Sequence, residues 1–241
     1  MAKMNRKTRP KKFKRDSSIH AKLRRRWRSW LPTLISDMTS LLGKRSIFWE
    51  LQDIAKANPK ILKPGAFFDW MCQNYIAAIT VGARRFTDQD YRSRSLWRML
   101  YEILENPGVI NRRAHISLYR GVPMSMGNPT FDAVVGVGKQ QLSQMQVRSD
   151  LRAIESANEK VRRFVNKRIA HFANPRDIRK FPTFNELDEA LDKIDKILCK
   201  YNLLLRASGM TSAYAERQYD WMEVLKEPWI IIKDDFEGSE A

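Results

Sequence analysis

The sequence contains few of the residues that build covalent or metal-bound frameworks. Among 241 residues there are two cysteines, Cys72 and Cys199, and three histidines. Two isolated cysteines are too few for a disulfide framework or a zinc site, so a reducing, cytoplasmic setting is expected. No apolar run approaches the ~18 residues that a membrane helix needs. The basic N-terminus is not followed by the apolar stretch of a secretory signal. We therefore predict no membrane partner, no metal and no other cofactor.

Charge is distributed unevenly along the chain. The formal net charge is +17, and residues 1–30 hold thirteen lysines and arginines against one acidic residue, Asp16. The remainder holds 31 basic and 26 acidic residues, so it is only mildly basic. A strongly basic arm on a nearly balanced globular part is typical of a protein that binds a polyanion. We expect RNA or another nucleic acid as a partner.

The basic arm is predicted to make those contacts. Residues 1–18 have no hydrophobic periodicity and are expected to be disordered when alone, whereas helix is expected from Ile19 to Trp30. Aromatic residues are interleaved with the lysines and arginines of the arm and are suited to stacking on nucleobases. The alternative is a solubilising tail without a binding role. The predicted nucleic-acid-binding residues are Lys11, Lys12, Lys14, Arg15, Arg24, Arg25, Arg26 and Arg28.

The rest of the sequence is typical of an all-α helical bundle. Apolar residues recur with helical spacing, and strands do not alternate with helices. A Thr-x-x-Glu capping box at Thr183 and Glu186 marks the start of the last long helix. The expected helices are residues 33–57 with an interruption near Gly43, 66–86 as a central buried helix, a helix starting at Asp88–Asp90 and stopping at Asn106, 139 to about 172, and 183 to a stop at Gly209.

Three parts are predicted along the chain. Residues 1–30 form the arm, residues 31–210 the bundle, and residues 211–241 a C-terminal tail that packs on the bundle as a short strand or extended segment. Within the bundle, residues 107–138 are rich in glycine and proline, so an irregular insertion is expected there. Among single residues, a solvated face is predicted for Glu102 and Glu105, a surface or packing position for His115, and core positions for Trp49, Trp70 and Trp97.

The stretch 161–174 carries the most chemistry, because it ends in a histidine surrounded by cations. At 100° per residue, Lys167 and Arg168 lie about 40° and 60° from His171 on a helix, and Arg163 lies about 80° away. An imidazole beside an ammonium and guanidiniums could bind a phosphate and take a proton from a ribose 2′-hydroxyl without a metal. The alternative is structural, because cations and histidine in a last helical turn are favoured by the helix dipole.

The residues Asn166-Lys167-Arg168-Ile169-Ala170-His171 resemble the motif region of HEPN-superfamily proteins, and especially of the AbiU-type abortive-infection family. A second stretch, residues 83–88 followed by Ser95-Leu96 and Leu100, is similar to the same family. The resemblance covers about residues 45–207. It implies an all-α bundle that often dimerises over a shared cleft, a role in phage defence or as a toxin, and an antitoxin or defence-system partner. Active members cut RNA without metal, using an Arg-x(4–6)-His pair.

One position departs from that pattern. Val165 stands where the motif arginine belongs, and valine cannot bind a phosphate. Either Arg163 or Arg168 replaces it from a neighbouring angle, or the site binds nucleic acid without cutting it. In the catalytic interpretation His171 is the general base, Asn166 and Lys167 orient groups, and Arg163 or Arg168 binds the phosphate. The rival interpretation is a non-catalytic nucleic-acid-binding or protein-interaction scaffold on the same fold.

Overall fold

The computed structural model of the chain describes residues 11–119, 124–164 and 183–229. Within these ranges the chain is all-α, as predicted, and its only β-pairing is an isolated bridge between Asn111 and Gln141. The elements are α1 (Lys11–Ala57), η1 (Pro59–Leu62), α2 (Ala66–Phe86), α3 (Leu96–Glu105), α4 (Arg112–Ile116), η2 (Met124–Met126), α5 (Gly127–Val135), α6 (Gln144–Phe164), α7 (Phe184–Arg206) and α8 (Glu223–Lys226).

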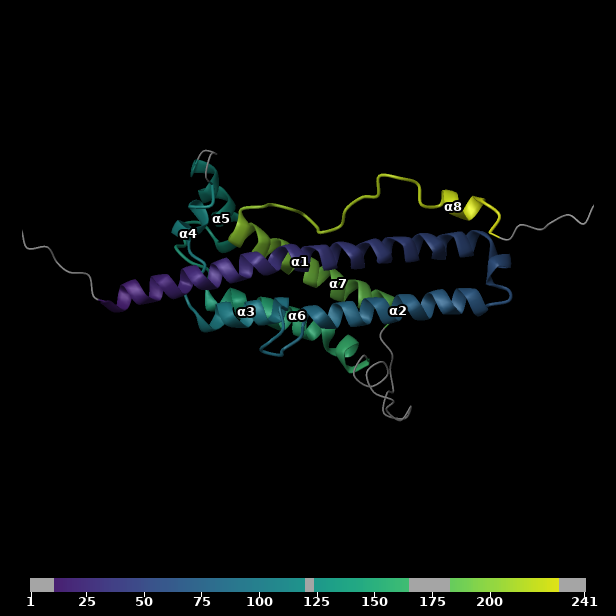
Figure 1. Cartoon of the computed structure of the whole chain (residues 1–241), viewed down its shortest axis with the longest axis horizontal. Coiled ribbons are helices and arrows are strands. Elements are labelled where there is room, and N and C mark those ends of the chain that lie inside the picture. Colours follow the sequence, from purple (N-terminus) through teal and green to yellow (C-terminus); the bar gives the residue numbers. More distant parts are fainter. Residues whose placement is uncertain (1–10, 120–123, 165–182, 230–241) are drawn as a thin grey trace, which may run out of the picture.

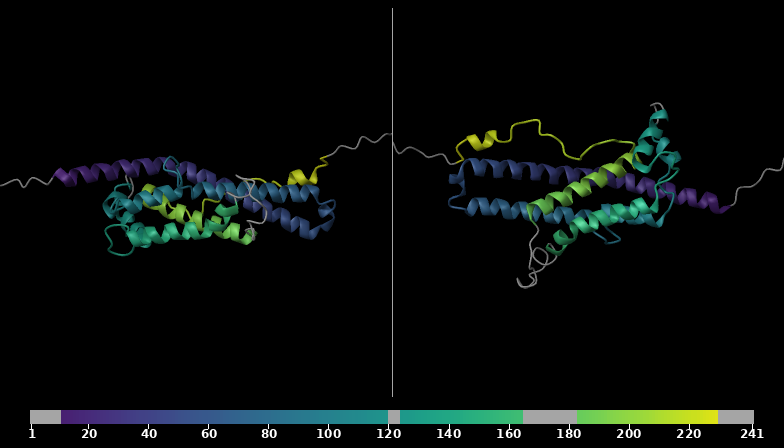
Figure 2. Two further views of the ribbon diagram at one scale, coloured as in Figure 1. Left: turned by 90° about the horizontal axis from the view of Figure 1, so that it is seen from below. Right: turned by 180° about the vertical axis from the view of Figure 1, so that it is seen from behind.

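The helices form an elongated bundle (Figure 1). Helices α1 and α2 run antiparallel as a long hairpin, and α7 packs against both of them. Helix α6 packs against α2, α3 and α7. The N-terminal half of α1 and helix α6 therefore lie on opposite sides of the bundle (Figure 2). A face built on α1 is separated by the core from a face built on α6.

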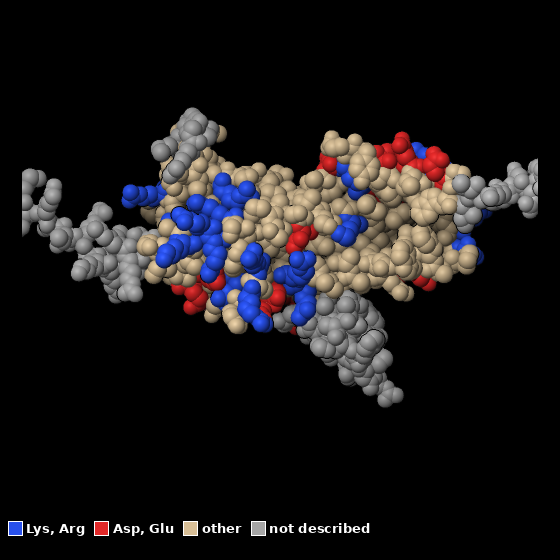
Figure 3. Space-filling view, viewed as in Figure 1, with Lys and Arg blue, Asp and Glu red and all other residues tan. Residues whose placement is uncertain are grey.

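Helix α1 is longer than the sequence predicted. It runs without a break for 47 residues from Lys11, so residues 11–18 are helical rather than disordered, and Gly43 causes no interruption. The cost of one glycine, about 1 kcal/mol, is offset by the burial of Leu41, Leu42 and Phe48 around it. Lysines and arginines gather over the N-terminal half of α1 and the neighbouring end of α2 (Figure 3).

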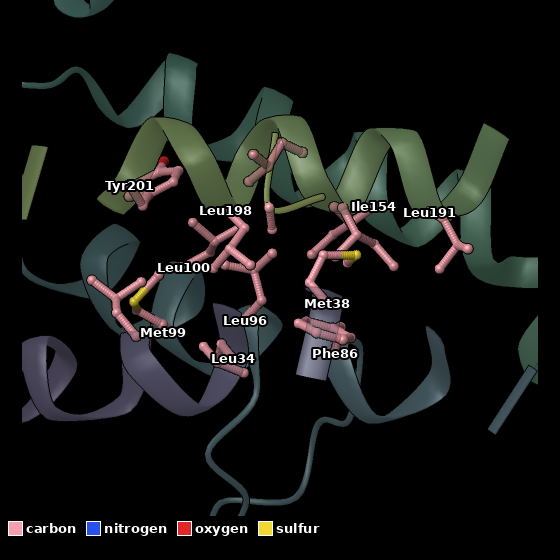
Figure 4. Packing of buried hydrophobic residues seen from close by; sticks show 14 of the residues in the cluster. Leu34, Met38, Phe86, Leu96, Met99, Leu100, Ile154, Leu191, Leu198 and Tyr201 are labelled. Carbon is pink, nitrogen blue, oxygen red and sulfur yellow. The ribbon is translucent and has the colours of Figure 1, made fainter. Parts of the chain in front are cut away.

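The core lies where α1, α2, α3, α6 and α7 converge (Figure 4). Helix α7 supplies its central row, and every residue of the predicted stripe is buried: Leu187, Leu191, Ile194, Leu198, Tyr201 and Leu205. The predicted capping box at its start is also present. The helix ends earlier than expected, at Arg206, because Ala207 takes the left-handed conformation at φ 54° that glycine was expected to supply at Gly209.

Helix α2 has the predicted bounds but is not buried along its length. Only its second half, from Tyr75 to Phe86, enters the core, whereas Phe67 and Trp70 are more than half exposed. The first half contains none of the buried residues of α2, and the Phe67 ring lies 6.3 Å from the Trp229 ring of the C-terminal tail. At the other end, a Cβ on Gly82 would lie 2.4 Å from Leu41 Cδ2. Glycine there permits the close approach of α1 and α2.

The segment expected to be an irregular insertion contains helices. Helices α4 and α5 with η2 occupy part of residues 109–138, and helix α6 starts at Gln144 rather than Lys139. Asn111 caps α4 by accepting a hydrogen bond from Ala114 N at 2.9 Å. Helix α3 also starts later than predicted, at Leu96, because Ser95 is its N-cap. Short helices of this kind lack the periodicity that a sequence pattern can reveal.

The C-terminal tail packs on the bundle as an extended strap that includes α8. It returns along α1 (Figure 1) and is fixed at two places. Asp195 accepts hydrogen bonds from Ser212 Oγ at 2.6 Å and Ala213 N at 2.9 Å. Further along, Glu50 accepts hydrogen bonds from the side chains of Arg217 and Trp221. Residues 230–232, part of the expected strand, lie outside the described residues.

Candidate nucleic-acid interface

The motif segment, which contains the family-like residues 166–171, lies in the sequence between α6 and α7. Arg163 lies in the last turn of α6 as far as that helix is described, while Asn166, Lys167, Arg168 and His171 lie outside the described residues. Both flanking helices are fixed in the core. Val161 is 1% exposed near the end of α6. At the start of α7, the Phe184 ring lies 4.9 Å from the Phe48 ring of α1. The core therefore determines where both ends of the segment are held.

The second family-like stretch has a structural explanation in the turn before α3. Ser95 Oγ donates a hydrogen bond to Asp88 O at 2.5 Å and accepts one from Arg98 N at 3.0 Å. Leu96, the next residue, is fully buried. Serine is suited to this position because its hydroxyl caps the helix while the following leucine enters the core. This Ser-Leu pair therefore fixes the start of α3.

Three of the predicted binding arginines hold the arm on the bundle. Arg24 NH1 donates to Val109 O at 2.8 Å, and Arg28 Nε donates to Leu205 O at 2.7 Å. Burial lowers the pKa of both guanidiniums, and the nearby Arg28 charge adds to the effect at Arg24. Arg26 forms an ion pair with Glu102. These three side chains are at least partly committed to the fold.

Glu102 is the residue that this docking depends on, and the sequence prediction for it was wrong. Instead of lying on a solvated face it is 9% exposed. It accepts hydrogen bonds from Trp27 Nε1 at 2.7 Å and Arg98 Nε at 2.9 Å in addition to Arg26. A signal was available, because Glu102 follows Met99 by three residues on the buried stripe of α3. A carboxylate at such a position needs cationic or N–H partners.

The structure describes the side chains of only some of the remaining arm residues. Arg25 is exposed, as is Lys22 one turn earlier. Helix α1 includes the other four predicted binding residues, but their side chains lie outside the described part of the structure: Lys11, Lys12, Lys14 and Arg15. Arg25 and Arg26 are both exposed, and of these two only Arg26 forms an ion pair with a carboxylate of the described side chains.

Sequence reasoning missed a second group of cations, at the end of α2 and in the loop before α3. Arg84, Arg85 and Arg94 are all exposed. Arg85 NH2 lies 3.1 Å from Asp37 Oδ2 of α1. A cavity of about 240 Å³ lies between these elements and is lined by Arg85, Arg94 and residues of α1. The clustered charge of residues 1–30 drew attention to the arm, whereas these arginines are spread over a balanced part of the sequence.

The other histidine of the bundle is a packing residue. His115 is 1% exposed, with Nδ1 3.1 Å from Leu204 O and Nε2 3.0 Å from Thr130 Oγ1. Burial lowers the pKa of His115, since desolvation disfavours the imidazolium. Among the described residues no group of three or more His, Cys, Asp or Glu side chains could hold a metal ion. No helix in the described ranges is long and apolar enough to cross a membrane.

The all-α bundle, with a cationic segment between its last two long helices, defines the chain as a HEPN-type protein. More specifically, residues 37–224 match the HEPN AbiU2 family, described as AbiU2, and the chain belongs to that family. Membership indicates an abortive-infection type of function. Searches of curated proteins and of solved structures gave no significant match. The matched region begins within α1, so Trp27 and the arm arginines precede it although Trp27 is fully buried in the same core.

Proposed function

We propose that this AbiU2-family protein acts on RNA during abortive infection, as a metal-independent endoribonuclease. The observation that carries the proposal is the family match over residues 37–224, which includes the segment ending in His171. Both helices that flank this segment are anchored in the core, through Val161 and Phe184. The basic half of α1, docked on the same bundle, supplies the positive charge that attracts a polyanion.

The chemistry requires only side chains of the segment. His171 takes the proton of a ribose 2′-hydroxyl, whose oxygen then attacks the adjacent phosphorus. The bond from phosphorus to the 5′-oxygen breaks, that oxygen takes a proton from water and leaves as a 5′-hydroxyl, and His171 returns its proton to water. The other product carries a 2′,3′-cyclic phosphate. Arg163 or Arg168 binds the phosphate, and Asn166 and Lys167 orient the reacting groups.

A second candidate function follows from Val165. Because the motif arginine is absent at this position, the segment could bind RNA without cutting it. The protein would then be a nucleic-acid-binding or interaction scaffold of the same family. This function predicts salt-dependent RNA binding without cleavage. The first function predicts both binding and cleavage.

The deciding experiment compares RNA cleavage by the purified wild-type chain and by His171→Ala, in the presence of a metal chelator. The proposed nuclease loses cleavage in the variant. Lys193→Ala, an exposed lysine on α7, serves as the matched control and should cleave like the wild type. Equal cleavage by wild type and His171→Ala would remove His171 from the mechanism. Binding without cleavage by the wild type would favour the scaffold.

A further inference from the structure

Helix α1 carries a line of hydroxyl groups on its outer face. Ser29, Thr33, Ser36 and Ser40 follow one another at intervals of four, three and four residues, and all four are exposed. This spacing places them on one side of a helix. Lys22 precedes the line by two helical turns, and Lys44 follows it by one turn with its Nζ 2.5 Å from Ser40 Oγ. Polar donors thus occupy one face of α1 continuously.

The line of hydroxyls borders a groove between α1 and the end of α2. One cavity of about 240 Å³ is lined by Thr33 of α1 and by Ser93 and Arg94 of the α2–α3 loop. A second cavity of about 220 Å³ continues along α1 and is lined by Ser40 and Lys44. Arg85 lines both cavities. The groove therefore has hydroxyls along one wall and guanidiniums along the other.

The positive charge at this groove is only partly neutralised. Asp37 and Asp88 also line the first cavity, and Asp37 pairs with Arg85 at 3.1 Å. No carboxylate of the described side chains lies within ion-pair distance of Arg94 and Lys44, which line the groove, or of the exposed Lys22 and Arg25 of α1. Unpaired cations interspersed with hydroxyl donors are the groups that contact phosphates in protein–nucleic acid complexes.

We propose that this groove binds the sugar-phosphate backbone of single-stranded RNA, a proposal that rests on the function proposed above. Arg85 and Arg94 contact phosphates from one wall, and the hydroxyls of Thr33 and Ser40 donate to phosphate oxygens from the other. Lys22 and Arg25 extend the path along α1. From Lys22 to Lys44 the helix rises about 33 Å at 1.5 Å per residue. That length accommodates several consecutive nucleotides.

A lipid surface fits this face less well. Membrane adsorption by a basic helix needs apolar side chains beside the cations. The large exposed aromatic side chains Phe67 and Trp70 lie in the first turns of α2, whereas Arg84 and Arg85 lie in its last turn. Phe67 and Trp70 are therefore separated from these arginines by nearly the whole length of α2, and Tyr91 is the exposed aromatic residue of the α2–α3 loop beside Arg94. Evenly spaced phosphates of a nucleic-acid strand match the groove better than a bilayer does.

The test measures binding of a fluorescent 12-nucleotide single-stranded RNA by anisotropy, in a His171→Ala background so that the probe survives. Arg85→Gln with Arg94→Gln should weaken binding about tenfold near 0.15 M salt, and should lower the slope of log K against log salt by about 1.4, or about 0.7 per phosphate contact. The control pair, Arg148→Gln with Arg152→Gln, removes the same charge from α6. It should leave the slope unchanged, because α6 lies across the core.

A second variant separates hydroxyl donors from charge. Thr33→Val with Ser40→Ala should weaken binding with the salt slope unchanged, because no cation is removed. All four positions are exposed, so thermal melting should match that of the parent. The proposal is overturned if the arginine pair binds like its parent or no more weakly than the control pair. It is also overturned if the parent binds phosphatidylserine vesicles but not the RNA.

These outcomes are distinct from failure of the nuclease. If RNA binds through the groove and the wild type cuts nothing, the nuclease fails and the groove remains. If His171→Ala abolishes cleavage while the arginine pair affects neither binding nor cleavage, the groove fails and the nuclease remains.

Discussion

Trp27 Nε1 donates a hydrogen bond to Glu102 Oε2 at 2.7 Å, joining two residues that are 75 positions apart. Trp27 is fully buried and belongs to the basic arm, whereas Glu102 belongs to α3. The arm is therefore built into the core of the bundle at this point. Its basic residues are presented from a fixed helix, which lowers the entropic cost of binding a partner along it.

Removing the carboxylate of Glu102 should destabilise the fold. Glu102→Ala leaves the buried indole N–H of Trp27 without an acceptor, which costs about 2 kcal/mol of unfolding free energy. Urea denaturation measures the loss. Glu105→Ala, an exposed glutamate of the same helix, should change stability by less than about 0.5 kcal/mol. Equal losses in the two variants would mean that Glu102 does not anchor the arm.

Shortening the arm should separate its binding role from its structural role. Deleting residues 1–18 removes lysines and arginines but leaves Trp27 and Leu31 in the core, so the melting temperature should stay close to that of the full chain. Deleting residues 1–28 also removes the Trp27 side chain, for which a loss of about 3–5 kcal/mol is expected. Circular dichroism melting of the two truncations checks this. Two equally stable truncations would contradict the docking of the arm.

Stability should decline as the pH falls below the ordinary pKa of histidine, in part because of His115. The pKa of this buried imidazole is lowered in the folded state, so the unfolded chain binds the proton more readily. Its contribution to stability is complete above a pH of about 6.5 and is lost as the pH falls below that value. Urea denaturation at pH 7 and pH 5 should show a smaller decline for His115→Gln than for the wild type. An equal decline in the two proteins would mean that His115 does not contribute to the loss of stability at low pH.

Restoring the family arginine should raise activity. Val165→Arg places a guanidinium where the Arg-x(4–6)-His pattern of active relatives has one, and it is expected to increase RNA cleavage by at least tenfold if phosphate binding limits the reaction. Val165→Leu is the matched control, because it changes size without adding charge. Single-turnover cleavage of a labelled RNA measures the rate. An unchanged rate would mean that Arg163 or Arg168 already fills the role.

Local sequence signals identified several elements correctly. The capping box at Thr183 and the apolar stripe of α7 were predictable because a helix that buries one face repeats every three or four residues. The bounds of α2, residues 66–86, were also predicted correctly. Its burial was not, because periodicity alone does not say which neighbouring elements cover a helix. Phe67 and Trp70 are more than half exposed.

The candidate interface was predictable only in part. The clustering of lysines and arginines in residues 1–30 indicated that the arm binds nucleic acid. Arg24, Arg26 and Arg28 instead hold the arm on the bundle through contacts with residues 76 to 177 positions away. The opposite wall of the groove was missed because Arg85 and Arg94 become its wall only when α2 and the α2–α3 loop fold against α1. The motif around His171 was recognised from its order of residue types, which indicates the family but gives no geometry.

The central claim is tested most directly by identifying the ends of RNA fragments produced in the presence of a metal chelator. Mass spectrometry of a defined RNA incubated with the wild-type chain should find 2′,3′-cyclic phosphate and 5′-hydroxyl ends, and His171→Ala should produce neither. Intact RNA with the wild type, or the same products from His171→Ala, would contradict the account.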